Sequence, residues 1–166
     1  MLTVGTKALP FALPNHTGVV VHVTPGENGQ PIALLFYPES GSFGCTKQAC
    51  QFRDAVAAKE EFKPDKMTVI GISPDPVQKQ GGFVTKHNLN FPILSDEKRE
   101  IANAYGVGTG MLGLVRYSRT TFIIDKKGII RDVLDATMNY GAHIDFVAKW
   151  AKILEKELDS APAPDS

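Results

Sequence analysis

The chain has 166 residues, 43% of them hydrophobic and 22% charged, a composition typical of one globular domain with a sizeable core. Lys and Arg together number 18, as do Asp and Glu, so the formal net charge is zero. This balance argues against a nucleic-acid partner, which favours a basic patch or stripe on the protein.

No stretch approaches the roughly 20 apolar residues of a membrane span, so we expect no membrane partner. The first seven residues, Met1 to Lys7, lack the charged start and apolar core of a secretory signal. We therefore expect an intracellular protein, in the cytoplasm by default, with the nucleus or an organelle left open. In such a reducing compartment, a chain with only two cysteines, Cys45 and Cys50, suggests redox chemistry or a metal rather than a disulfide scaffold.

Taken in chain order, apolar runs and helical patterns alternate. The β-branched run 19–23 predicts a short strand, and the continuous apolar runs 32–37 and 67–73, each closed by a proline, predict buried central strands. The runs 120–125 and 129–134 flank a Lys-Lys-Gly turn and predict a hairpin. Helices are predicted from about 45 to 62, at 76–88, at 97–105 after a Ser95-Asp96 cap, and at 145–158.

This order predicts an α/β protein. A strand, a helix and a second strand imply parallel pairing with a right-handed crossover, and the hairpin adds antiparallel strands. The fold expected is therefore thioredoxin-like, a mixed central sheet flanked by helices. We expect one domain over residues 1–159 and a disordered, Pro-rich tail over residues 160–166.

Cys45 is expected in the first turn of the helix that follows the buried strand 32–37. Sites in open α/β sheets lie at the carboxyl ends of strands, and the start of a helix favours an anion such as a thiolate. A thiolate that attacks one oxygen of a peroxide expels the other and becomes a sulfenic acid, which a second thiol converts to a disulfide. Cys50 is the only other thiol in the chain.

A disulfide between these two cysteines requires the helix to change. Residues five apart on an intact helix have Cα atoms about 8.6 Å apart, whereas a disulfide needs Cα atoms within about 7 Å. We therefore expect the first turns of the helix to unwind when Cys45 and Cys50 join.

The segment 38–54 resembles the active-site loop of peroxiredoxins. That family's pattern of Pro, three residues, Thr or Ser, two residues and Cys is matched by Pro38, Ser42 and Cys45. The run Gly-Cys-Thr-Lys-Gln-Ala-Cys at 44–50 is similar to the peroxiredoxin Q, or bacterioferritin comigratory protein, subgroup. The segments 5–14, 69–73 and 91–96 resemble further landmarks of the family, so the resemblance covers most of the chain.

The resemblance implies a thiol peroxidase that reduces hydrogen peroxide or organic hydroperoxides without a metal, haem or flavin. It implies that Cys45 is the peroxidatic cysteine, that Cys50 is the resolving one, and that thioredoxin recycles the disulfide. Ser42 would hydrogen-bond the peroxide, Arg119 would hold the thiolate anionic and polarise the O–O bond, and Pro38 would shield the pocket. Members of the subgroup are often monomers, and we expect a monomer here.

The chain departs from this subgroup beside the cysteine. Most members carry Thr-Pro-Gly where this chain has Ser42-Phe43-Gly44. Serine keeps the hydroxyl, but Phe43 gives up the fixed φ angle of proline and adds an apolar ring at the pocket mouth. We expect altered mobility of the loop or a preference for larger, apolar hydroperoxides.

Several alternatives stay open from the sequence. Arg116 and Arg53 compete with Arg119 for the active-site role, and Cys50 is also consistent with a core residue whose resolving role passes to another molecule. A redox sensor or holdase signalling through the same disulfide is the alternative function. A thiol–disulfide oxidoreductase or a zinc site would want the cysteines closer together, as in Cys-x-x-Cys.

Overall fold

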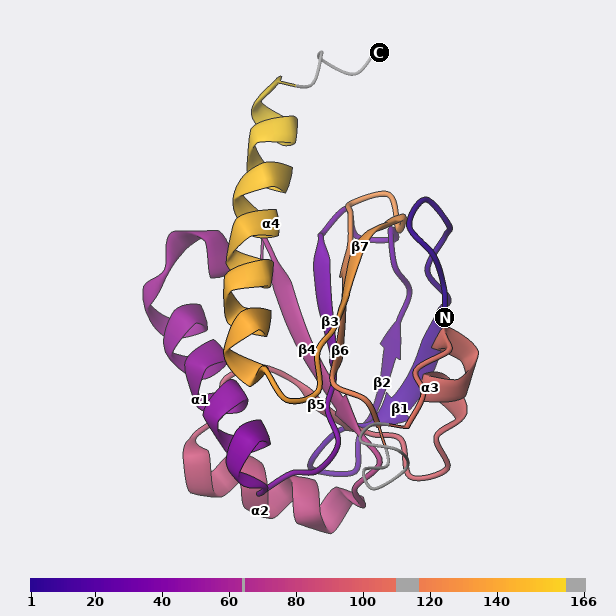
Figure 1. Cartoon of the computed structure of the whole chain (residues 1–166), viewed down its shortest axis with the longest axis vertical. Helices are drawn as coiled ribbons and strands as arrows, with labels where there is room; N and C mark the ends of the chain where they lie inside the picture. Colours follow the sequence, from indigo (N-terminus) through magenta and orange to yellow (C-terminus); the bar gives the residue numbers. More distant parts are fainter. Residues whose placement is uncertain (64, 110–116, 161–166) are drawn as a thin grey trace.

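A five-stranded mixed sheet forms the centre of the computed structural model, which describes residues 1–63, 65–109 and 117–160 (Figure 1). Across the sheet the strands are β5 (Ile93–Ser95), β4 (Thr68–Ser73), β3 (Ile32–Phe36), β6 (Thr120–Ile124) and β7 (Ile130–Asp135). β3, β4 and β5 are parallel, whereas β6 runs antiparallel to both β3 and β7. The predicted mixed sheet and the hairpin are confirmed, and the three-residue strand β5 was not predicted.

The strand predicted at 19–23 lies outside this sheet. It is β2 (Val20–Val23), which pairs antiparallel with β1 (Phe11–Pro14) in a separate two-stranded ribbon. β1 is only four residues long and ends on a proline, so its sequence carries little strand signal.

The helices differ from the predictions at their ends. They are α1 (Phe43–Ala58), α2 (Val77–His87), α3 (Glu100–Tyr105) and α4 (Tyr140–Ser160), with a 3₁₀ turn at Glu60–Phe62. The single helix predicted to residue 62 is wrong, because the backbone of Lys59 is extended and separates α1 from the 3₁₀ turn. α4 begins five residues before the predicted start, after Asn139, whose side chain accepts from the N–H of Ala142.

α3 begins three residues after its predicted start, because Arg99 takes a left-handed conformation with φ 59°. Asp96 nevertheless caps this helix, since its carboxylate accepts from the backbone N–H groups of Ile101 and Ala102. Ser160 is the last residue of α4, and the rest of the predicted tail, 161–166, lies outside the described residues.

Two apolar layers hold the helices to the sheet. Alternate residues of β3 point to opposite faces: Leu34 and Phe36 join the layer under α3 and the β1–β2 ribbon, while Ala33 and Leu35 join the layer under α1 and α4. In Figure 1, α1 and α4 lie together on one side of the sheet and α3 with β1 and β2 on the other. In the part of the chain described here, no helix is both long and apolar enough to cross a membrane.

Candidate active site

The loop between β3 and α1 is fixed at both ends. At its beginning the backbone N–H of Ser40 donates to the buried carboxylate of Asp75, with 2.7 Å between nitrogen and Oδ2. At its end Ser42 is the N-cap of α1: its Oγ accepts from the N–H of Cys45 at 3.4 Å and donates to the carbonyl oxygen of Glu39 at 3.0 Å. Gly41 makes the turn between them with φ 91°, a conformation that favours glycine.

Cys45 therefore lies in the first turn of α1, where only 2% of its surface is exposed. Arg119, the residue before β6, reaches it from the sheet, and its Nη1 lies 3.3 Å from the Cys45 Sγ. The positive end of the helix and a guanidinium that stays charged both favour the thiolate form of a cysteine. The arrangement can therefore hold a nucleophilic sulfur anion.

Arg119 is itself buried and held in place by neutral groups. Its Nε donates to the carbonyl oxygen of Thr137 at 3.1 Å, and its Nη1 donates to Oε1 of Gln48 at 2.5 Å. Among the described residues, no carboxylate lies within ion-pair distance of this guanidinium. As a thiolate, the Cys45 sulfur would therefore be the anion that pairs with this guanidinium.

The sequence prediction missed Gln48. Its side chain is 3% exposed, and its Nε2 has no hydrogen-bond partner among the described residues. Its position three residues after Cys45 places both side chains on the same face of α1, a spacing that could have identified it.

A cavity of about 240 Å³ opens beside Arg119. Its lining includes Pro38, Ser42 and Arg119, three of the residues that the sequence assigned to the site. Its rim is apolar: Phe43 and Met138 are 72% and 73% exposed, and the Phe43 ring meets the Tyr140 ring edge to face at 6.3 Å.

Cys50 lies on the same intact helix but faces another neighbour. It is half-buried, and its Sγ lies 3.9 Å from Nδ1 of His87 at the end of α2. Both cysteines are free thiols in this structure. Of the competing arginines, Arg53 pairs with Asp54 and the His87 carbonyl oxygen, not with Cys45, and Arg116 lies outside the described residues.

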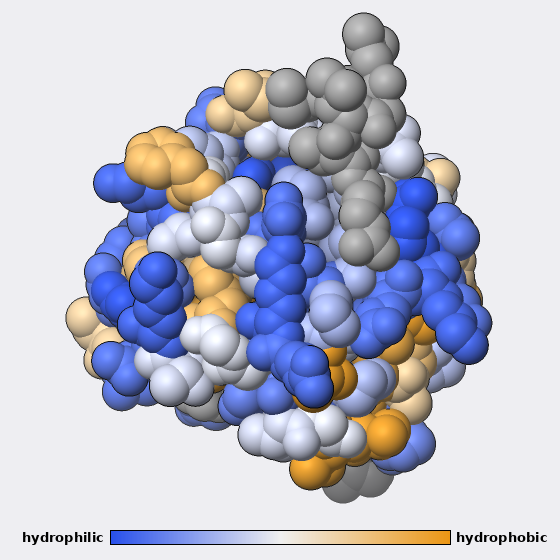
Figure 2. Space-filling model, turned by 90° about the horizontal axis from the view of Figure 1, so that it is seen from below, coloured by the Kyte–Doolittle hydropathy of each residue, from blue (hydrophilic) through white to orange (hydrophobic). Residues whose placement is uncertain are grey.

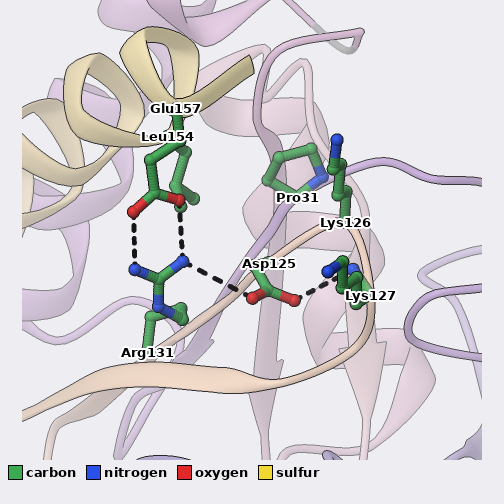
Figure 3. A pocket seen from close by; sticks show the side chains of 7 residues that line it. All are labelled: Pro31, Asp125, Lys126, Lys127, Arg131, Leu154 and Glu157. Atoms are coloured by element: carbon green, nitrogen blue, oxygen red, sulfur yellow. Dashed lines mark hydrogen bonds and ion pairs between the residues drawn. The ribbon is translucent and has the colours of Figure 1, made fainter. Parts of the chain in front are cut away.

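A second cavity of about 240 Å³ lies at the opposite end of β3, before its first residue (Figure 3). Three of its charged side chains bind each other, because Arg131 pairs with both carboxylate oxygens of Glu157 and with Asp125. The other carboxylate oxygen of Asp125 accepts from the backbone N–H of Lys127. These contacts join the β6–β7 hairpin to α4, and no cysteine lines the cavity.

Known proteins resemble the chain over most of its length. The model of the AhpC/TSA family matches residues 4–133. A protein of Mycobacterium tuberculosis named as a peroxiredoxin is 37% identical over 142 residues, which are 85% of this chain and 90% of the relative. The chloroplastic peroxiredoxin Q of Sedum lineare is 34% identical over 154 residues, 93% of this chain and 80% of the relative.

Solved structures agree. The crystal structure of peroxidoxin BcpB from Mycobacterium tuberculosis is similar to this chain with a TM-score of 0.79 and 33% sequence identity. The similarity covers 93% of this chain and 99% of that one. The sheet and the helices around it therefore have the arrangement of a peroxiredoxin.

Proposed function

Because the chain belongs to the AhpC/TSA family, whose peroxiredoxin members are thiol-dependent peroxidases, we propose that Cys45 is its peroxidatic cysteine and Cys50 its resolving cysteine. The observation that carries this assignment is the 3.3 Å contact between Arg119 Nη1 and the Sγ of Cys45 at the start of α1. Buried thiols elsewhere in proteins are inert when nothing favours their anion.

The reaction begins at the sulfur of Cys45. Its thiolate attacks one oxygen of the peroxide, the O–O bond breaks, and the other oxygen leaves with the bonding electrons and takes up a proton, as water or an alcohol. Arg119 donates to the oxygens on which charge builds up in the transition state. Cys45 is left as a sulfenic acid, which Cys50 converts to a disulfide with release of water.

Ser42 and Pro38 complete the pocket in this proposal. The Ser42 hydroxyl exchanges its bond to the Glu39 carbonyl for one to the peroxide, and Pro38 keeps water from the reacting atoms. Their place in the lining of the cavity beside Arg119 supports both roles.

Thioredoxin is the reductant we propose, acting on a monomer in the cytoplasm. The test is consumption of hydrogen peroxide by the chain with thioredoxin, thioredoxin reductase and NADPH. We expect Cys45→Ser to abolish turnover and Cys50→Ser to stop it after one oxidation. Full turnover in Cys45→Ser would end the main proposal, and full turnover in Cys50→Ser would make this a one-cysteine enzyme.

The rim of the cavity supports a preference for organic hydroperoxides. Phe43, Met138 and Tyr140 offer an apolar surface that a bulky substrate can cover. Partial burial of a phenylalanine stabilises by about 1 kcal/mol, roughly a factor of five in binding. Phe43 is the first residue of α1, where proline is well tolerated, so Phe43→Pro should remove the ring and keep the helix.

We therefore expect Phe43→Pro to lower the ratio of kcat/KM for cumene hydroperoxide to kcat/KM for hydrogen peroxide by about fivefold. Phe43→Leu keeps an apolar side chain and should give an intermediate ratio. The same ratio in all three proteins would rule out a role for the ring in substrate choice.

A further inference from the structure

Cys50 and His87 form a thiol–imidazole pair outside the cavity that Arg119 lines. The Sγ lies 3.9 Å from Nδ1 of His87, the last residue of α2. His87 is held at two points: its ring meets the Phe83 ring at 5.3 Å, and its backbone oxygen accepts from Arg53 Nη1 at 2.7 Å. The reaction described above uses the Cys50 thiol and gives His87 no role.

The two halves of α1 are held to the rest of the molecule very differently. In the second half, Phe52 is fully buried against the rings of Phe62 and Phe91, and the backbone oxygen of Arg53 accepts from Asn90. At the start of the helix, Phe43 is 72% exposed.

Unwinding the first turns therefore costs less apolar burial than unwinding the second half. We therefore expect Cys45 to move toward Cys50 when the helix opens for the disulfide, and Cys50 to stay beside His87.

We propose that His87 is a catalytic residue of the resolving step, which accepts the proton of Cys50 as this thiol attacks. The proposal rests on the resolving role proposed for Cys50. The S–H bond of Cys50 breaks, its proton passes to Nδ1 of His87, and its electron pair forms the S–S bond with the Sγ of Cys45. The S–O bond of the sulfenic acid breaks, and the hydroxide that leaves takes a proton from the imidazolium and departs as water. No further oxidant or reductant is needed, and the imidazole ends neutral.

The position of His87 suits a transient cation. It lies at the C-terminus of α2, where unpaired carbonyl groups favour positive charge. Charged side chains surround it on both helices. They include Arg53, which pairs with Asp54 on α1, and Lys86 on α2. Lys47 and Lys79 lie along a groove of about 750 Å³ between the two helices. Lys79 is paired there with Glu39 and Asp75.

This groove opens beside Cys50, which is half-buried, whereas Cys45 is buried. The face that α2 and the beginning of α1 form is seen from below in Figure 2, where hydrophilic residues predominate and hydrophobic residues lie between them and toward the edges of the view. A small thiol reagent can therefore report on Cys50 in the folded protein.

The first experiment uses Cys45→Ser, which leaves Cys50 as the only thiol of the chain. Its rate of alkylation by iodoacetamide is measured from pH 5.5 to 8 with and without His87→Gln, which keeps the backbone oxygen that Arg53 binds. An unassisted thiol is only a few per cent thiolate at pH 7, so we expect His87→Gln to slow alkylation at least about threefold there.

The pH profile provides a readout that a structural role would not change. Only a neutral imidazole can accept a proton, so the rate with His87 divided by the rate in His87→Gln should fall as the solution is made more acidic, whereas a structural effect would leave this ratio constant. Lys86→Gln is the matched control, because it removes a neighbouring charge and keeps the imidazole; its rate should stay within about twofold of the rate with Lys86 present at every pH. Equal rates and profiles with and without His87 would overturn the proposal.

The second experiment follows the two-cysteine protein after one equivalent of hydrogen peroxide. In His87→Gln, disulfide formation should lag further behind loss of the Cys45 thiol, and dimedone should trap more sulfenic acid. Disulfide formation at the unaltered rate would overturn the proposal. If Cys50→Ser keeps full turnover, the resolving role of Cys50 fails; if it loses turnover while His87→Gln has no effect, only the role of His87 fails.

Discussion

At the scale of single residues, Gln48 binds the part of Arg119 that faces the Cys45 sulfur. Its Oε1 accepts from the same Nη1 that lies 3.3 Å from the sulfur. Gln48→Met keeps much of the volume and removes this acceptor, so the guanidinium loses one of the bonds that orient it. A hydrogen bond to a charged group is worth about 1.5–3 kcal/mol, and we expect the rate of Cys45 oxidation by hydrogen peroxide to fall about tenfold.

The fold should change less than the rate, because the substitution also removes an Nε2 that has no partner among the described residues. Gln51→Met makes the same chemical change on the exposed side of α1 and is the control. A Gln48→Met protein as fast as Gln51→Met would show that Arg119 is oriented without Gln48. Stopped-flow measurement of the first oxidation separates this effect from later steps.

At the scale of elements, α1 must open before Cys45 and Cys50 can join. Both lie on one helix over Phe43–Ala58, and residues five apart on a helix are too distant for a disulfide. Amide hydrogen exchange over residues 46–53 should therefore be at least about tenfold faster in the disulfide form than in the reduced form. Exchange within α2 provides an internal reference, and peroxide-treated Cys50→Ser, which cannot form the disulfide, is the control. Equally slow exchange over 46–53 in both forms would contradict the expected opening.

The elements that could be predicted from the sequence are those with strong local patterns. The apolar run of β3 and the turn of the β6–β7 hairpin placed their strands correctly. The start of α4 was missed because it depends on a cap at Asn139 rather than on apolar spacing. The end of α1 was misjudged because Phe62 continues the apolar pattern into a 3₁₀ turn, although the backbone has already left the helix at Lys59.

At the scale of the whole molecule, the site combines segments far apart in sequence. The resemblance of segment 38–54 to a known active-site loop selected Cys45 and Ser42, and the strand after Arg119 favoured this arginine over Arg53. Spacing along the chain cannot reveal Thr137, whose carbonyl oxygen orients Arg119 across the β6–β7 pair, nor the approach of α2 to α1 that brings His87 to Cys50. These contacts come from tertiary packing, to which local patterns are blind.

The stability of the whole molecule should fall in mild acid because of His143. This fully buried side chain joins α4 to the sheet: its Nε2 donates to the Ala136 carbonyl oxygen at 3.0 Å, so its Nδ1 is free to accept from the Thr121 hydroxyl at 2.8 Å. Burial, with Arg119 nearby, lowers the pKa of His143 below its ordinary value of 6.5, which means that the unfolded chain takes up a proton at a higher pH than the folded one. The free energy of unfolding should therefore decrease as pH falls below about 6.5, by at most about 1.4 kcal/mol per pH unit from this group.

Urea denaturation at pH 7.5, 6.5, 6.0 and 5.5 measures this dependence. His143→Gln should lower stability at every pH, because it disturbs both hydrogen bonds, but it should show a shallower decline between pH 6.5 and 5.5 than the unaltered chain. His22→Gln removes a histidine that is exposed on β2 and should leave the slope as it was. The same slope with and without His143 would show that other groups govern the acid response. The comparison of slopes separates proton uptake by the imidazole from a simple loss of packing, which would lower the curve without changing its shape.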